Sequence, residues 1–277
     1  MISCQDVPSG DGRVLRAYDS GLGGAVGTVV WHHGSPQTGA LLEPLLVAAA
    51  ERGIRLLSYG RPGYGGSDRV PGRDVASAGV DVGRVADAFG VERFAVMGAS
   101  GGGPHAIACA AVLPERVGSV VCLAGIAPLT DEFDWFAGMV SPGGLRAALD
   151  GRAARERFAE VDEFDPAAFT PADWGVLGGE WESLGADAQR AGQAGSGGLV
   201  DDDVAFTSPW GFEPASVAAP VLLVQGGQDR VVPPSHADWL HRRLPRAELW
   251  SRPDDGHVSV LRACGEAMDW LVVNRTG

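Results

Sequence analysis

A serine between small residues is the strongest candidate nucleophile in this sequence. Ser100 lies in the run GASGG at 98–102, which follows an apolar, strand-like run at 94–97 and precedes a helix-forming run at 105–111. A serine at a sharp turn from strand to helix has a strained backbone, so the positions two away on each side must be small. Such a turn exposes the hydroxyl and aims backbone N–H groups at a developing negative charge. The run therefore predicts nucleophilic catalysis by Ser100.

A serine hydroxyl is a weak nucleophile, so this chemistry needs a base and a group that orients the base. Asp229 follows the apolar run 221–224, and His257 follows the run 247–250. Because the carboxyl ends of parallel strands meet at one edge of a sheet, we expect both side chains beside Ser100. The sequence thus predicts that His257 takes the serine proton and that Asp229 orients the imidazole.

Other acids and histidines are interpreted as structural. Three acids are alternatives to the predicted orienting group: Asp203, Asp254 and Asp255. His32 and His33 precede a tight turn, HGSP, and are expected to support it or to line the pocket. His105 is expected to pack within the helix after the nucleophile. His236 and His241 are expected at the surface.

Strand-like apolar runs alternate with helical patterns along most of the chain. This alternation predicts an α/β protein with a mostly parallel central sheet and helices on both faces. The expected strands lie at 28–31, 54–58, 94–97, 117–123, 221–224 and 247–250, and the expected helices at 41–50, 74–89, 235–243 and 258–273. A further strand at 14–18 is expected to be antiparallel, near the N-terminal edge of the sheet.

Residues 131–208, here called the cap segment, interrupt this alternation. The cap segment has short helical patterns, many aromatic side chains, and 16 of the 35 acidic residues against 5 of the 22 arginines. We expect a helical cap inserted between a first core part, 1–130, and a second core part, 209–277. The candidate substrate contacts are His33, Trp135, Trp174 and Trp210. The excess of acids predicts either a negative entrance to the site or a soluble outer face.

Five short motifs in a fixed order make the chain similar to the α/β-hydrolase fold family, in a version with an inserted helical cap. They are WHHGSP at 31–36, GRPGYGGS at 60–67, GASGG at 98–102, QDRVVP at 228–233 and DGH at 255–257. The resemblance covers nearly the whole chain outside the cap segment, and the order serine, aspartate, histidine is that of the family. It implies Ser100, Asp229 and His257 as the catalytic residues, with the backbone N–H groups of Ser35 and Gly101 as the oxyanion hole.

The resemblance also implies a serine hydrolase that forms an acyl-enzyme. The favoured substrate is a carboxylic ester or lactone of a small, largely apolar molecule. Thioester hydrolysis, carbon–carbon bond hydrolysis and cofactor-free perhydrolysis use the same three residues and stay open. A proline-iminopeptidase-like activity is the runner-up, because an acidic cap suits a free amine, although residues 33–37 read HGSPQ where that family usually has HGGPG. A receptor that binds its ligand without turnover is an alternative of another class.

From the composition, we expect a small-molecule substrate as the binding partner of this chain. All 22 basic residues are arginine, which excludes a lysine Schiff base and a Walker lysine, and the net charge of −13 disfavours nucleic acid. The four cysteines are widely spaced, so we expect neither a metal site nor a cofactor. Without a long apolar run or a signal-peptide pattern, the sequence favours a cytoplasmic protein with no membrane insertion. The oligomeric state is not predicted.

Overall fold

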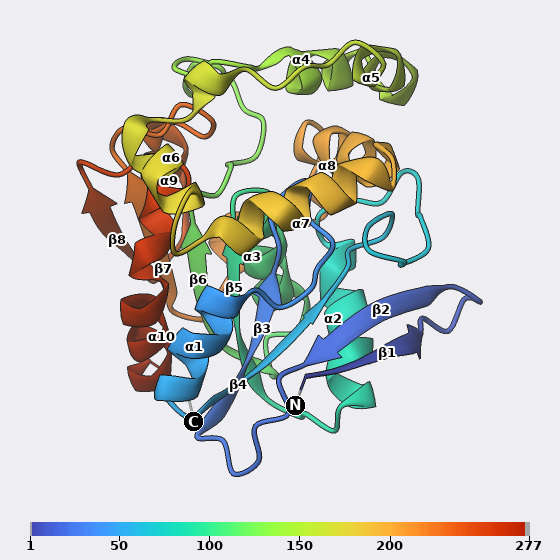
Figure 1. Cartoon of the computed structure of the whole chain (residues 1–277), viewed down its shortest axis with the longest axis vertical. Coiled ribbons are helices and arrows are strands. Elements are labelled where there is room, and N and C mark those ends of the chain that lie inside the picture. The colour runs from blue at the N-terminus through green and yellow to red at the C-terminus, as the bar shows by residue number, and fades with distance from the viewer. Residues whose placement is uncertain (1, 275–277) are drawn as a thin grey trace.

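An eight-stranded sheet forms the centre of the computed structural model, which describes residues 2–274 (Figure 1). The strands are β1 (Ser3–Pro8), β2 (Val14–Asp19), β3 (Gly27–His32), β4 (Ile54–Tyr59), β5 (Phe94–Ala99), β6 (Val117–Leu123), β7 (Val221–Gly226) and β8 (Ala247–Arg252). Their order in the sheet is β1-β2-β4-β3-β5-β6-β7-β8. Only the pairs β1–β2 and β2–β4 are antiparallel. The predicted α/β fold with a mostly parallel sheet is confirmed.

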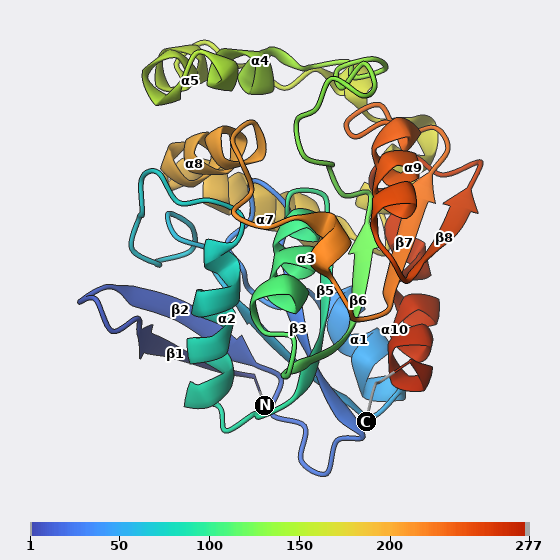
Figure 2. The same cartoon turned by 180° about the vertical axis from the view of Figure 1, so that it is seen from behind.

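Helices cover both faces of the sheet, as its apolar strands require. One face carries α1 (Glu43–Glu51) and α10 (Cys264–Val273), and the other carries α2 (Ser77–Ala88), α3 (Gly102–Val112) and α9 (Pro234–Arg243) (Figures 1 and 2). Successive side chains of a strand point to opposite faces. In β3, for example, Val30 packs in the core beside α2 and α3, whereas Val29 and Trp31 pack in the core beside α1 and α10.

The two ends of the chain differ in detail from the expected elements. The edge strand β1 was not predicted, because most of its side chains are exposed and it lacks an apolar run. The expected helix at 258–273 is divided into a 3-10 helix, η3 (Ser259–Ala263), and α10. This division matters for the site, since η3 begins two residues after His257.

The cap segment lies over the carboxyl ends of the parallel strands (Figures 1 and 2). Its helices are α4 (Gly143–Leu149), α5 (Arg152–Ala159), η1 (Pro166–Ala168), α6 (Pro171–Leu177), α7 (Glu182–Gln193) and α8 (Gly197–Phe206), and η2 (Pro214–Ser216) follows it. The domain boundaries after 130 and 208 stay a prediction. Among residues 2–274, no helix has the length and apolarity needed to cross a bilayer.

Candidate active site

Ser100 occupies a tight turn between β5 and α3. Its φ is +53°, in the left-handed region that non-glycine residues rarely adopt. A Cβ on Gly98 would lie 2.3 Å from the Gly102 carbonyl oxygen, and one on Gly102 would lie 2.1 Å from the His32 carbonyl oxygen. Both positions therefore need glycine for steric reasons, and the turn that the sequence predicted is present.

The structure brings Ser100, His257 and Asp229 into one hydrogen-bonded relay. His257 Nε2 lies 2.9 Å from Ser100 Oγ, and His257 Nδ1 lies 2.8 Å from Asp229 Oδ2. The other carboxylate oxygen of Asp229 accepts from the backbone N–H groups of Val231 and Val232, at 2.8 and 2.9 Å. These bonds fix the carboxylate, which in turn holds the Nδ1 proton and leaves Nε2 free to accept the serine proton.

The electrostatics of the relay favour the protonated form of the base. Burial of the imidazole lowers the pKa of His257, but the charge and the hydrogen bond of Asp229, together with the charge of Asp173, raise it by more. The net pKa of His257 is therefore above its ordinary value of 6.5. The same interactions would stabilise the imidazolium if His257 took the proton of Ser100.

The three alternative acids do not take the place of Asp229 beside His257. Asp203 forms an ion pair with Arg155 of α5, with 2.6 Å between Oδ2 and Nε, and burial raises the pKa of this carboxyl to about 6. Asp254 is exposed and Asp255 is half-buried in the same loop as His257. The bond to the imidazole is made by Asp229 instead.

One expectation about the histidines is wrong. His236 is completely buried rather than at the surface. Its Nδ1 accepts from Ala127 N at 3.1 Å, and its Nε2 donates to the Trp135 carbonyl at 2.9 Å, so it ties α9 to the start of the cap segment. His241 is exposed, as expected, and His105 packs in α3 with Nδ1 donating to the Gly101 carbonyl at 2.7 Å.

The turn after β3 lies directly against the nucleophile turn. A Cβ on Gly101 would lie 2.4 Å from Ser35 Oγ, and a Cβ on Gly34 would lie 3.6 Å from Ser100 Cβ. In the described part of the chain, the N–H groups of Ser35 and Gly101 donate no hydrogen bond to another protein group. Two unpartnered backbone donors beside the nucleophile are suited to bind an oxyanion.

His33 supports this turn from inside the core. Its Nδ1 donates to the Gly34 carbonyl at 2.7 Å, and its Nε2 accepts from Arg61 N at 3.0 Å. Burial and the nearby Arg61 guanidinium hold the pKa of His33 well below 6.5, so the ring is neutral. Both ring nitrogens are already used in shaping the turn.

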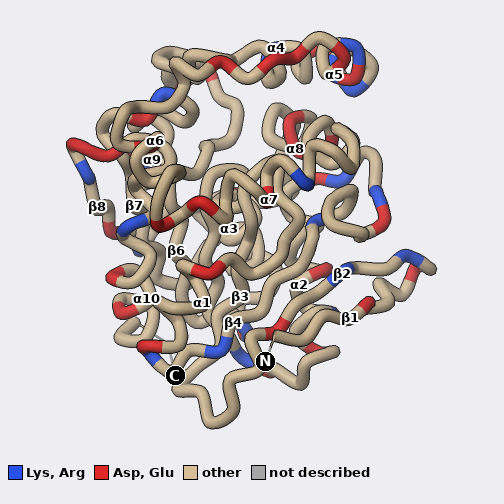
Figure 3. The backbone as a smooth tube through the Cα atoms, viewed as in Figure 1, with Lys and Arg blue, Asp and Glu red and all other residues tan. Residues whose placement is uncertain are grey.

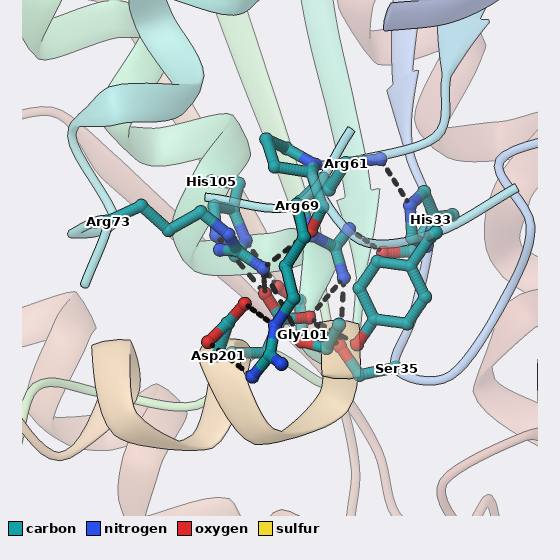
Figure 4. Close-up of polar contacts among 12 residues, drawn as sticks. His33, Ser35, Arg61, Arg69, Arg73, Gly101, His105 and Asp201 are labelled. Carbon is teal, nitrogen blue, oxygen red and sulfur yellow. Dashed lines mark hydrogen bonds and ion pairs between the residues drawn. The ribbon is translucent and has the colours of Figure 1, made fainter. Parts of the chain in front are cut away.

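A buried ion cluster joins the same turn to the cap segment. Asp202 of α8 accepts from Arg61 at 2.7 Å, from Arg73 at 2.6 Å and from the Tyr64 hydroxyl at 2.9 Å, and Ser35 Oγ also donates to it. Arg61 donates to Ser35 Oγ as well, at 2.8 Å. Figure 4 shows Arg61, Arg73 and Ser35 converging on α8. Burial raises the pKa of Asp202, but the two guanidinium groups hold it well below its ordinary value, so the carboxylate is charged.

The neighbours of Asp202 on α8 are also paired. Asp201 binds Arg69 of the core, at 2.7 Å, and Arg152 of α5, and Asp203 binds Arg155. Figure 3 shows the acidic positions of α8 close to basic ones. Sequence reasoning missed this role, although three consecutive aspartates in a helix were a visible signal.

The tryptophans named as substrate contacts lie in two different surroundings. Trp135 and Trp210 are buried in an apolar cluster with Phe206, whose ring lies against Gly101. Trp174 is 44% exposed and contacts the rings of two phenylalanines of the cap segment. Contact of these tryptophans and of His33 with a substrate stays a prediction. Within residues 2–274, no three or more His, Cys, Asp or Glu side chains are grouped so that they could hold a metal ion.

Comparison with known proteins gives one consistent result. The family model described as alpha/beta hydrolase fold matches residues 27–263. The chain is 26% identical over 272 residues to a 2-hydroxy-6-oxo-6-phenylhexa-2,4-dienoate hydrolase of Burkholderia cepacia, covering 88% of this chain and 84% of the relative. It is 28% identical over 213 residues to a pimeloyl-[acyl-carrier protein] methyl ester esterase of Neisseria meningitidis, covering 72% of this chain and 74% of the relative.

A solved structure confirms the fold. A thermophilic esterase from Thermogutta terrifontis superposes with a TM-score of 0.72 and 19% sequence identity, over 99% of this chain and 100% of that one. The likeness spans the cap segment as well as the sheet.

Proposed function

Because the chain belongs to the α/β-hydrolase family, we propose that it is a serine hydrolase that cleaves a carboxylic ester or lactone of a small, largely apolar molecule. The relay of Ser100, His257 and Asp229, with distances of 2.9 and 2.8 Å, is the observation that carries this proposal. Among the relatives, one is an esterase and another is a hydrolase of a different class of substrate.

The proposed reaction begins with attack of Ser100 Oγ on the ester carbonyl carbon. His257 Nε2 takes the serine proton, and the carbonyl electron pair moves to oxygen, where the N–H groups of Ser35 and Gly101 stabilise the negative charge. His257 then gives the proton to the departing alkoxide, which leaves an acyl group on Ser100. A water molecule, deprotonated by His257, attacks the acyl carbon. His257 then gives this proton to the departing Ser100 Oγ, which releases the acid and regenerates the free serine.

The surroundings of the nucleophile support an apolar substrate. Phe206 lies against Gly101, and it packs with Ala205, Trp210 and Val232 in one apolar cluster. Val232 is three residues from Asp229, so this cluster reaches both sides of the relay. An apolar acyl or alcohol group is stabilised when it leaves water to contact apolar side chains of this kind.

The charges of the site disfavour two of the alternatives. A free substrate amine, as in an aminopeptidase, needs an available carboxylate, but Asp201, Asp202 and Asp203 are each paired with arginine. A dienoate such as the substrate of the Burkholderia relative carries a carboxylate and needs a free cation. Arg61 is the cation that bonds to the turn after β3, but it is buried and bound to Asp202, so it is not free to bind a substrate carboxylate.

Hydrolysis of p-nitrophenyl esters by the purified protein tests the proposal. We expect multiple turnovers with neutral acyl chains of two to eight carbons, and loss of turnover in Ser100→Ala. Hydroxylamine added during turnover should yield more hydroxamate of the acyl group than it does with Ser100→Ala, because it intercepts the acyl-enzyme. Absence of turnover on esters, lactones and thioesters alike would contradict the proposal.

A further inference from the structure

A buried carboxylate of the cap segment contacts the loop that carries His257. Asp173, on α6, is completely buried. Its Oδ1 accepts from Val258 N at 2.8 Å, from Ser259 N at 2.7 Å and from Ser259 Oγ at 2.9 Å. These donors are the two residues that directly follow His257, and 85 or more positions of sequence separate them from Asp173.

The same carboxylate also lies against the residue before His257. A Cβ on Gly256 would lie 2.1 Å from Asp173 Oδ2, so only glycine fits there. Gly256 N donates to Ser259 Oγ at 2.7 Å, which closes the loop on itself. Asp173 therefore touches the chain on both sides of His257 and restricts the position of its imidazole.

The other bonds of this carboxylate fix it to its own helix. Asp173 Oδ2 accepts from Thr170 N and Thr170 Oγ1, at 2.8 and 2.9 Å, and Asp173 N donates back to Thr170 Oγ1. This reciprocal pair is a capping box at the start of α6. One carboxylate thus joins the first turn of a cap helix to the histidine loop of the core.

Asp173 is charged at neutral pH. Burial raises the pKa of its carboxyl, but hydrogen bonds from Ser259 and Thr170 lower it by more, so the net pKa is below the ordinary value. The groups that face His257 are Ser100 at Nε2, Asp229 at Nδ1 and, through the loop contacts, Asp173. Burial lowers the pKa of His257, and the charges of Asp229 and Asp173 raise it.

We propose that Asp173 is a positioning residue for the catalytic histidine. Through Asp173, the contact between the cap segment and the core sets the position of His257 and the charge close to it. The proposal rests on the proposed function, because it assumes that His257 is the base for Ser100. Asp173 would thus affect proton transfer at His257 although it does not contact the substrate.

The test compares two isosteric variants, each of which removes one buried cap carboxylate. Asp173→Asn keeps an oxygen that accepts from Val258 and Ser259 but removes the charge. Asp187→Asn is the matched control: Asp187, on α7, is also buried, and it accepts from Thr38 N and Thr38 Oγ1 of a core loop at 2.9 and 2.6 Å, away from the histidine loop. The readout is the rate at which a fluorophosphonate labels Ser100 from pH 5 to 9.

The labelling rate should fall at acidic pH as His257 becomes protonated. In Asp173→Asn we expect this fall to occur at a lower pH, because loss of a negative charge destabilises the imidazolium. In Asp187→Asn the fall in labelling rate should occur at the same pH as in the wild-type protein. An unchanged pH of this fall in a cooperatively folded Asp173→Asn protein would overturn the proposal, since a purely structural carboxylate leaves the titration of His257 unaltered.

Two further measurements keep the test decisive. If Asp173→Asn does not fold, Ser259→Ala removes the hydroxyl that donates to Asp173 and accepts from Gly256 N, and leaves the backbone bonds to Asp173 in place. It should lower the plateau labelling rate several-fold; an unchanged plateau rate would overturn the positioning role. Proton NMR titration of the His257 ring, assigned by its loss in His257→Asn, reads the same shift without any reaction. Failure of the wild-type protein to label would contradict the proposed function, whereas an NMR shift in Asp173→Asn would still support the coupling.

Discussion

At the scale of single residues, Ser100 depends on partners that come from separate loops. Its strained φ of +53° is imposed by the turn. Its hydrogen-bond partner His257, the proposed proton acceptor, comes from the loop after β8, and Asp229, which holds that histidine, comes from the loop after β7. In the proposed mechanism the three side chains act on one proton, so the loss of any one should remove most of the rate enhancement that the other two provide.

Ser100→Ala and His257→Ala should each lower kcat/KM for an ester by about 10⁴-fold or more, and the double variant should be little worse than either. Asp229→Asn should also cost orders of magnitude, because the amide favours the wrong tautomer of His257. Steady-state kinetics on one ester checks this. Near-normal turnover in Asp229→Asn, with an inactive Asp203→Asn, would show that the orienting acid is misassigned.

The pH profile follows from the direction of the His257 pKa. The base must be neutral to accept the serine proton, and its pKa is raised above 6.5. The logarithm of kcat/KM should therefore rise with pH, bend above 6.5 and level off in the alkaline range. A rate that is flat from pH 5 to 8, with chemistry limiting, would rule out histidine as the base.

At the scale of elements, the active site depends on how closely β5, α3 and the turn after β3 approach one another. The sequence motifs predicted this junction because part of its requirement is local: glycine at 98 is dictated by the Gly102 carbonyl within the same turn, whereas glycine at 102 is dictated by the His32 carbonyl of the neighbouring strand. The roles of Asp202 and Asp173 were not predicted, because their partners lie 141 and 85 positions away. The same holds for His236, whose partners Ala127 and Trp135 are 109 and 101 positions distant.

Two glycine substitutions should have opposite effects on stability. Gly102→Ala places a Cβ 2.1 Å from the His32 carbonyl oxygen and should lower the free energy of unfolding by at least about 2 kcal/mol. Gly185→Ala, in α7, meets nothing within 4 Å and should raise it by about 0.5–1 kcal/mol. Urea denaturation of both variants measures the difference. Equal stability of the two would show that the nucleophile turn is looser than described.

At the scale of the whole molecule, the net charge of −13 is carried by acids other than the aspartates of α8. Several cap acids, among them Asp201, Asp202 and Asp203, are paired with arginines. The predicted negative entrance therefore rests on the remaining unpaired acids.

A neutral ester should have a higher kcat/KM than an anionic ester of the same size, and the ratio should shrink with salt. The Debye length falls from about 30 Å at 0.01 M to about 3 Å at 1 M, so the repulsion of an anion is screened over this range. Measuring both esters at several salt concentrations checks it. An anionic ester that is equally good at low salt and insensitive to salt would remove the cap charge from substrate selection.

The central claim is that His257 activates Ser100 as a covalent nucleophile, and labelling by a fluorophosphonate tests it most directly. Peptide mass spectrometry after labelling should find a single adduct, on Ser100, in the wild-type protein. Labelling should be slowed by orders of magnitude in His257→Ala and be absent in Ser100→Ala. An adduct on another residue, or equal labelling of the wild type and His257→Ala, would contradict the account.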